Sequence, residues 1–342
     1  MHVGRVLRKI AWIAGITILV CVVLILIALA PTEDLPSFIR HNTRALTTRR
    51  FDSTPERLKR GRYITQTVAH CFACHSPRED HPAHHGSFVP GQDAKGQFGT
   101  WGPYHLAVPN LTPDQETGIG NWTDDQLARA MREGIGHDGR VLTTMMPYQW
   151  FSRMSDEDLA SVIVYLRSLP PVRNPLPRMR LPLILRLLDP SYPEPITSSV
   201  PQPDLSDPLQ RGAYYIALGK CFDCHTAQNW RGKPIPGLEF AGGNWFPDGE
   251  VSAPNLTPDP SGISYYDEAM FIQVMRTGKV GGVRELHGPM PWWEVGHMTD
   301  EDLKAMFAYL RTLRPVKHRV DNDEPRRYCT VCRRKHRGGA LN

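Results

Sequence analysis

The chain has 342 residues, of which 41% are hydrophobic and 22% charged, and this is ordinary globular composition. Its length predicts about two domains. The net charge of +5 is unevenly distributed, because residues 317–342 carry eight Lys/Arg against three Asp/Glu while residues 51–316 sum to −5. An acidic body gives no indication of a nucleic-acid partner. The basic N-terminal and C-terminal segments are better explained as exposed to solvent or close to anionic lipid headgroups.

The N-terminus predicts a membrane anchor. Three basic residues within residues 1–9 precede an uncharged stretch over residues 10–30, which is long enough to cross a hydrocarbon core as a helix. The basic leader places residues 1–9 in the cytoplasm and everything downstream on the outer side. A cleaved signal peptide is the alternative, since Ala28-Leu29-Ala30 resembles a cleavage site, but secretory apolar regions usually run about 7–15 residues. We interpret residues 31–54 as a linker.

Two copies of C-x-x-C-H stand 150 residues apart, at residues 71–75 and 221–225. This motif is the attachment signature of a c-type haem. Two cysteines about one helical turn apart can both form thioethers with one porphyrin, and the histidine then lies under the iron as proximal ligand. A zinc ribbon would need its second cysteine pair about 15–20 residues after the first. The sequence therefore predicts two covalently bound haem c groups. Their binding residues are Cys71, Cys74, His75, Cys221, Cys224 and His225.

The haem motifs belong to a longer internal repeat. Three further segments recur at offsets of 144 or 145 residues: P-N-L-T-P-D from Pro109 and Pro254, Met-Pro from Met146 and Met290, and a D-E-D-L helix after Met154 and Met298. The nearly constant offset confines insertions to loops. We expect one domain over residues 55–172 and a second over residues 206–316.

Each repeat predicts three main helices joined by long loops, with no strand pattern, and hence an all-α fold of two tandem cytochrome c-like domains. The first helix starts near Pro55 or Pro208 and runs into the haem motif, with a glycine at the place where helices cross closely. The second helix lies between Thr123 and Gly134, with a counterpart from about Tyr266 to Gly278. The third begins at a capping box and has an apolar face at helical spacing.

Met146 and Met290 are the candidates for the second axial ligand of each iron. Each precedes a proline and stands 13 residues before the leucine that starts the apolar face of the third helix. Met145 competes with Met146, but only the second methionine is common to both repeats. His/Met ligation raises the reduction potential relative to histidine alone. We expect the other ring nitrogen of His75 and His225 to donate to the backbone carbonyls of Pro109 and Pro254.

Six other histidines of the first repeat have no counterpart in the second, and we expect them to be solvent-exposed rather than metal-binding. They are His70, His81, His84, His85, His105 and His137. Between the repeats, residues 173–205 form a proline-rich linker. Its apolar segment, residues 181–188, either packs between the two repeats or faces a membrane or a partner subunit.

The C-terminal segment, residues 317–342, is a basic tail containing Cys329-Thr-Val-Cys332. Arg333 stands where a haem motif needs histidine, so this is not a third haem site. A local disulfide, a labile metal site with His336, and idle thiols all remain open. Cys21, inside the apolar span, is expected to be inert.

These motifs together resemble the dihaem c-type cytochromes, including the cytochrome subunits of bacterial membrane-bound alcohol, gluconate and sugar dehydrogenases. The resemblance covers roughly residues 55–316 and also rests on T-G-I-G-x-W from Thr117 and M-P-Y from Met146. Many such subunits carry three haems, whereas this sequence has two haem motifs.

The resemblance implies electron transfer rather than catalysis. The expected partners are a periplasmic donor such as a membrane-bound dehydrogenase and a quinone or oxidase of the respiratory chain, with a single-pass location in the bacterial inner membrane. The alternative is a dihaem enzyme of the peroxidase or thiol/thiosulfate-oxidising type. Such an enzyme needs an open iron position, whereas both repeats offer a methionine.

Overall fold

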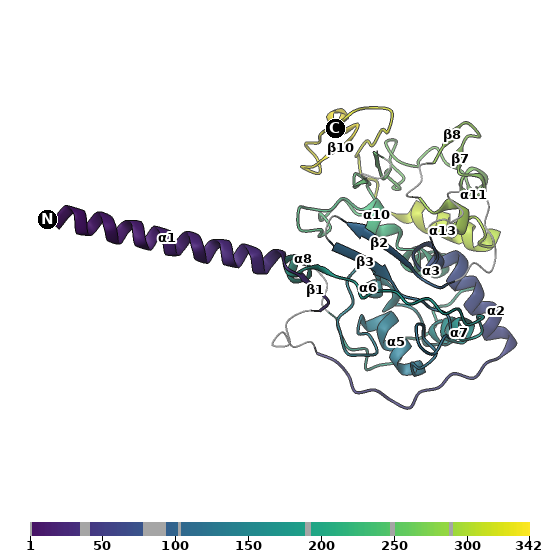
Figure 1. Cartoon of the computed structure of the whole chain (residues 1–342). Coiled ribbons are helices and arrows are strands. Elements are labelled where there is room, and N and C mark those ends of the chain that lie inside the picture. Colours follow the sequence, from purple (N-terminus) through teal and green to yellow (C-terminus); the bar gives the residue numbers. More distant parts are fainter. Residues whose placement is uncertain are drawn as a thin grey trace.

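One long helix projects from a mostly helical body (Figure 1). The structure is a computed structural model, and it describes residues 2–34, 42–77, 94–101, 104–188, 193–246, 250–286 and 290–342. The projecting helix, α1, spans His2–Leu29. Within the described residues, its segment 8–29 is the one helix long and apolar enough to cross a membrane, and none of that segment is buried against the body.

The first repeat contains the helices expected from its sequence. They are α2 (Pro55–Tyr63), the π-helical turn η1 (Ile64–Val68), α3 (Cys71–His75), α5 (Asp124–Glu133), α6 (Tyr148–Phe151) and α7 (Asp156–Arg167). The second repeat has the same order without the π turn. Its helices are α9 (Pro208–Leu218), α10 (Cys221–His225), α11 (Glu268–Thr277), α12 (Trp292–Val295) and α13 (Asp300–Thr312).

The expectation of an all-α fold is only partly right, because the loops contain short antiparallel strand pairs. β2 (Gln97–Trp101) pairs with β3 (Tyr104–Val108), β5 (Trp245–Phe246) with β6 (Val251–Ser252), and β7 (Lys279–Val280) with β8 (Arg284–Glu285). In the tail, β9 (Arg326–Tyr328) pairs with β10 (Lys335–Arg337), and the chain ends in η4 (Gly339–Leu341). Strands of two to five residues contain too few positions for a readable two-residue alternation.

Capping interactions fix the helix ends where the sequence placed them. Thr123 and Gln126 form a complete capping box at the start of α5, and Gly134 ends that helix in the left-handed region at φ 69°. Ser155 and Thr299 cap α7 and α13, each accepting a hydrogen bond from a backbone N–H of the first turn. These contacts satisfy amide groups that a helix start would otherwise leave unpaired.

Glycine lets the first helix of each repeat cross the third at close range. An added Cβ at Gly61 would lie 1.9 Å from the backbone oxygen of Ser161, and one at Gly212 would lie 2.0 Å from that of Ala305. The apolar faces of α7 and α13 both contribute to one core drawn from both repeats. Its buried members on the two third helices are Leu159, Val162, Ile163, Leu166, Leu303, Met306, Phe307 and Leu310.

The two repeats are joined by a reciprocal tyrosine exchange, in which one tyrosine of each repeat forms a hydrogen bond with an aspartate of the other repeat. Arg60 makes two hydrogen bonds of 2.8 Å to Asp158 of its own repeat. The same carboxylate accepts a 2.7 Å hydrogen bond from Tyr214 of the other repeat. In the second repeat, Arg211 donates to Asp302 at 2.5 Å, and the hydroxyl of Tyr63 reaches across to the same carboxylate. The two repeats are therefore arranged about an approximate two-fold axis.

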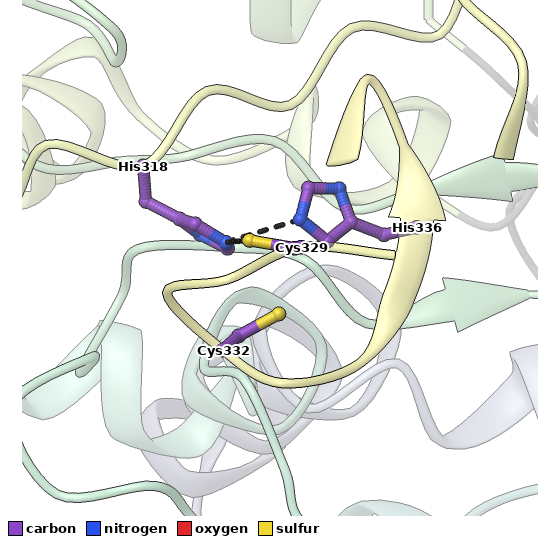
Figure 2. A group of neighbouring side chains, drawn as sticks. All are labelled: His318, Cys329, Cys332 and His336. Carbon is purple, nitrogen blue, oxygen red and sulfur yellow. Dashed lines mark hydrogen bonds between the residues drawn. The ribbon is translucent and has the colours of Figure 1, made fainter. Parts of the chain in front are cut away.

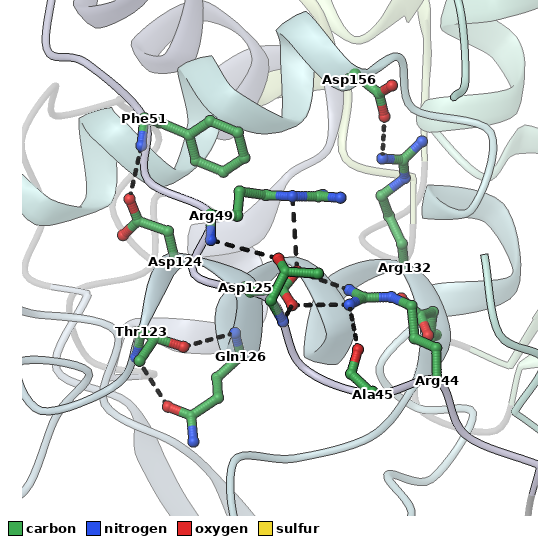
Figure 3. Close-up of polar contacts among 12 residues, drawn as sticks. Arg44, Ala45, Arg49, Phe51, Thr123, Asp124, Asp125, Gln126, Arg132 and Asp156 are labelled. Carbon is green, nitrogen blue, oxygen red and sulfur yellow. Dashed lines mark hydrogen bonds and ion pairs between the residues drawn. The ribbon is translucent and has the colours of Figure 1, made fainter. Parts of the chain in front are cut away.

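A polar network fastens the segment before α2 to the face of α5 (Figure 3). Arg44 makes a two-point contact with Asp125, at 2.7 and 2.8 Å, and also donates to Glu133 at 2.8 Å. The backbone amides of Thr47 and Phe51 donate to Asp125 and Asp124, respectively. Asp125 is fully buried, so these contacts replace the hydration that its carboxylate loses.

The apolar segment of the linker lies beside the end of α1 rather than between the repeats. β4 (Leu181–Pro182) pairs with β1 (Pro31–Thr32), and Leu183 donates to the carbonyl of Ala30 at 3.1 Å. The short helix α8 (Leu183–Leu188) follows and packs against α1. The side chain of Leu188 is 62% exposed. The first of the two placements expected for this segment is therefore wrong.

Candidate haem-binding sites

The histidine of each haem motif is fixed by the same hydrogen bond. Nδ1 of His75 lies 2.8 Å from the carbonyl oxygen of Pro109, and Nδ1 of His225 lies 2.8 Å from that of Pro254. The carbonyl can only accept, so Nδ1 carries the proton and Nε2 keeps its lone pair for a metal. This confirms the carbonyls expected from the repeat. Burial lowers the pKa of His75 to about 4, and that of His225 falls for the same reason.

The P-N-L-T loops hold those carbonyls in place. The amide nitrogen of Asn110 donates to the carbonyl of Val172, and its oxygen accepts from the backbone N–H and the hydroxyl of Thr112. Asn255 and Thr257 make the corresponding bonds, with Val316 in place of Val172. Sequence reasoning found the repeated motif but not this role of its Asn and Thr.

The two haem motifs begin next to each other. His70 and Lys220, the residues before the first cysteine of each motif, both adopt the left-handed conformation, at φ 50° and 57°. A Cβ at Gly219 would lie 3.6 Å from the backbone oxygen of Val68, which places the two turns in contact across the approximate two-fold. None of the four motif cysteines is paired in a disulfide among the described residues. Burial raises the pKa of Cys71 and Cys221 to about 12.

Met146 and Met290 lie in turns of the same shape. The backbone N–H two residues further on donates to each methionine carbonyl at 2.8 Å. Pro147 and Pro291 have nearly identical torsions, φ −81°, ψ 51° and φ −80°, ψ 50°. Both methionines are partly buried against the core, whereas Met145 is 56% exposed. Ligation of iron by either methionine remains a prediction.

The short helix after each methionine packs against the haem motif of the other repeat. In α6 the ring of Trp150 lies 5.3 Å from that of Phe222, inside the second motif. In α12 the carboxylate of Glu294 lies 3.3 Å from Nδ1 of His70, directly before the first motif. His70 is 4% exposed, so the expectation that it is solvated is wrong.

The other unmatched histidines give less information. His137 is exposed, as expected, with its ring centroid 4.2 Å from that of Trp122. His81, His84 and His85 lie outside the described residues, as does the side chain of His105.

Comparison with known proteins agrees with this geometry. The family model of cytochrome c matches residues 58–170. These residues therefore form a cytochrome c domain. It is 31% identical over 276 residues to the fructose dehydrogenase cytochrome subunit of Gluconobacter japonicus, covering 76% of this chain. It is 27% identical over 289 residues to the cytochrome c subunit of the alcohol dehydrogenase (quinone) of Gluconobacter oxydans, covering 78% of this chain.

A dihaem c-type cytochrome of Cereibacter sphaeroides is 27% identical over 261 residues, which cover 72% of this chain and 83% of that one. By contrast, the aligned regions cover only 53% and 56% of the fructose and alcohol dehydrogenase subunits. A cytochrome c domain implies covalently bound haem c. The two cysteines one helical turn apart and the fixed histidine tautomer, present at both residues 71–75 and 221–225, fit that group.

Proposed function

We propose that this chain is a membrane-anchored dihaem cytochrome c that transfers electrons from a periplasmic donor to the respiratory chain. Residues 55–172 and 206–316 form two cytochrome c domains, each with one covalently bound haem. His75 with Met146, and His225 with Met290, are the axial ligands. The observation that carries this proposal is the equal fixing of His75 and His225 by a proline carbonyl, 2.8 Å away in both repeats.

Bound haem would supply an iron that cycles between the ferric and ferrous states, and the chain's own residues tune that cycle. The carbonyls of Pro109 and Pro254 keep each imidazole in one tautomer and increase its basicity. The contact between the turns at Val68 and Gly219 brings the edges of the two haem sites together. This proximity supports electron exchange within the molecule.

The donor we propose is a dehydrogenase, because relatives of this chain are named as cytochrome subunits of alcohol, fructose and gluconate dehydrogenases. A quinone or an oxidase is the proposed acceptor. The chain itself is then an electron carrier and not the catalytic subunit. The repeated methionine turns argue against the dihaem peroxidase or thiol-oxidising alternative, because such enzymes need an iron with an open position.

The proposed location is the inner membrane, with α1 as a single span and both haem domains in the periplasm. Support comes from the exposure of α1, whose spanning segment has none of its apolar window buried in the body, and from the basic residues that precede it. The exposed leucines of α8, beside the end of α1, fit the lipid surface.

Two measurements test the number of haems and their ligation. The intact mass of protein made with a haem-attachment system should exceed that of the polypeptide by two haems, and acid-acetone should extract none. Met146→Ala should remove about half of the near-infrared charge-transfer band that thioether ligation gives ferric haem, and Met290→Ala the rest. Each variant should lower the potential of its own haem and open that iron to carbon monoxide.

Met145→Ala is the matched control, because it removes an exposed methionine directly beside the proposed ligand. Its spectrum, its potentials and its inertness to carbon monoxide should equal those of the wild type. A wild-type ferrous protein that binds carbon monoxide readily at one haem would reveal an open site. The dihaem enzyme would then replace the carrier as the better function.

A further inference from the structure

Four side chains of the C-terminal segment converge on one point (Figure 2). They are His318, Cys329, Cys332 and His336, and one nitrogen or sulfur atom from each lies within 4.8 Å of all the others. The two histidines and Cys329 are fully buried, and Cys332 is 2% exposed. Two thiols and two imidazoles without access to solvent are an unusual core unless they share a ligand.

A β-hairpin carries three of these four side chains. β9 and β10 pair with Tyr328 opposite Lys335, so residues 329–334 form the connecting loop and His336 stands on the second strand. The N–H of Cys329 donates to the carbonyl of Arg334 at 2.8 Å, and Arg333 adopts the left-handed conformation at φ 56°. This turn directs both sulfur atoms to the same side. His318 completes the group from the segment that follows α13.

The hydrogen bonds of the two imidazoles fix where their protons are. Nδ1 of His318 lies 2.8 Å from the carbonyl oxygen of Ala241, and Nδ1 of His336 lies 2.8 Å from that of Arg337. Both Nδ1 atoms therefore carry hydrogen, and both Nε2 atoms present lone pairs. Those two Nε2 atoms are 3.1 Å apart, and Sγ of Cys329 lies 3.4 Å from Nε2 of His318. Two lone pairs facing each other at this distance repel unless a cation lies between them.

The separations of 3.1 and 3.4 Å are close to two edges of a metal tetrahedron. With bonds of about 2.05 Å to nitrogen and about 2.3 Å to sulfur, a tetrahedral zinc ion separates two nitrogens by about 3.3 Å and a nitrogen from a sulfur by about 3.6 Å. We propose that His318, Cys329, Cys332 and His336 bind one structural zinc ion. Four protein ligands and complete burial leave no open coordination position, and a closed site of this kind is structural rather than catalytic.

The zinc would fasten the basic tail to the second repeat. Ala241, which accepts from His318, precedes Gly242, whose N–H donates at 2.7 Å to the carbonyl of His225. A Cβ at Gly243 would lie 2.7 Å from Cε1 of His318, so the ring fits directly onto this loop. Arg337 adds a backbone hydrogen bond of 3.0 Å to the hydroxyl of Ser252. The site thus connects the tail to the loop behind the second haem motif.

The test is to measure zinc and iron together in the full-length protein, purified in detergent without chelator and made with a haem-attachment system. We expect one zinc per chain. Zinc-edge X-ray absorption, which haem iron does not disturb, should show two sulfur neighbours at about 2.3 Å and two nitrogen neighbours at about 2.0 Å. Cys332→Ser should lower the zinc content at least about tenfold with haem content unchanged, whereas Cys21→Ser, a cysteine of α1, should leave zinc unchanged.

A second measurement keeps the proposal falsifiable if Cys332→Ser fails to fold. Removing zinc from the wild-type protein with a chelator should expose the Lys/Arg-rich tail to trypsin, and adding Zn²⁺ back should restore its protection. A wild-type protein that neither contains zinc nor takes up one equivalent after reduction overturns the proposal. The proposal is also overturned if protein isolated without oxidant has an intact mass two hydrogens below that of the reduced chain and peptide mapping locates a Cys329–Cys332 disulfide.

Discussion

At the scale of single residues, the contact between His70 and Glu294 is the least expected feature of the haem region. Both side chains are buried, and Nδ1 of His70 lies 3.3 Å from the carboxylate of Glu294. Burial lowers the pKa of His70 and raises the pKa of Glu294 to about 8. Desolvation thus favours a neutral pair, in which the carboxyl group keeps its proton and faces the imidazole.

This pair predicts a pH dependence of stability. The pKa of Glu294 is raised in the folded chain, from about 4.3 in the unfolded chain. The stability provided by its proton is therefore complete below about pH 4.3 and is lost as the pH rises through about 8. Glu294→Gln stays neutral throughout, so its melting temperature should exceed that of the wild type by a margin that grows from pH 5 to pH 8 and reaches about 4 °C or more.

Thermal unfolding followed by circular dichroism across that pH range measures the margin. His70 is present in both proteins, so the difference isolates the carboxyl group. Glu301→Gln, which changes an exposed glutamate of α13, is the control and should give a margin that does not grow with pH. Parallel wild-type and Glu294→Gln curves would mean that Glu294 is charged in the folded protein across this range.

At the scale of secondary-structure elements, the crossings of α2 with α7 and of α9 with α13 depend on glycine. Alanine favours a helix over glycine by about 1 kcal/mol. Against that gain, a Cβ at Gly61 would lie 1.9 Å from a backbone oxygen of α7, and overpacking typically costs about 1–3 kcal/mol. A backbone atom cannot rotate away as a side chain can, so the cost should exceed the gain.

Gly61→Ala and Gly212→Ala should therefore each destabilise the protein by about 1–2 kcal/mol net. Gly15→Ala is the matched helical control, because no atom lies within 4 Å of its added Cβ. Denaturant unfolding of the three variants tests the comparison. Unchanged stability at both Gly61 and Gly212 would show that the helices separate freely at these crossings.

An element could be predicted from the sequence when the interactions that form it join residues close together in the chain. The capping box at Thr123 and the apolar face of α7 are set by residues three or four apart, so their helices were found with nearly correct ends. The carbonyl of Pro109 could be assigned to His75 because the loop recurs at Pro254. The pairing of β1 with β4 joins residues about 150 positions apart, and no short-range sequence pattern predicts it.

The same reasoning explains what was missed in the two sites. Cys329, Cys332 and His336 were noted in the sequence, but His318 was not, because a loop brings it back from 11 residues before the first cysteine. The exchange of Tyr63 and Tyr214 between repeats also escaped prediction. Both tyrosines stand in a recognised repeat, yet nothing in a repeat specifies whether its tyrosine contacts its own aspartate or that of the other copy.

At the scale of the whole molecule, α1 is tied to the body instead of hanging from a free tether. The pairing of Pro31 and Thr32 with β4 begins directly after the helix ends, and α8 lies beside the junction. If α1 spans the membrane, the full-length protein should remain in membranes after a high-salt wash and require detergent for release. N-terminal sequencing of the extracted protein should then find residues that precede Pro31.

A version that begins at Pro31 behind a cleavable signal peptide is the control, and it should be soluble in the periplasm with its haem content intact. A natural mature chain that starts at Pro31 and occurs in the soluble fraction would contradict the anchor. It would identify residues 1–30 as a cleaved signal peptide.

The tyrosine exchange also bears on the origin of the molecule and on the direction of current through it. Contacts in which Tyr63 meets Asp302 and Tyr214 meets Asp158 have the self-complementary form of a symmetric homodimer interface, as if an ancestral dimer had been fused into one polypeptide. If each repeat binds one haem, as proposed, the two redox centres are related by this symmetry, and the symmetry itself does not distinguish the centre that receives electrons from the centre that donates them. Polarity must come from what breaks the symmetry, namely the α1–α8 junction and the cysteine-histidine tail on the second repeat.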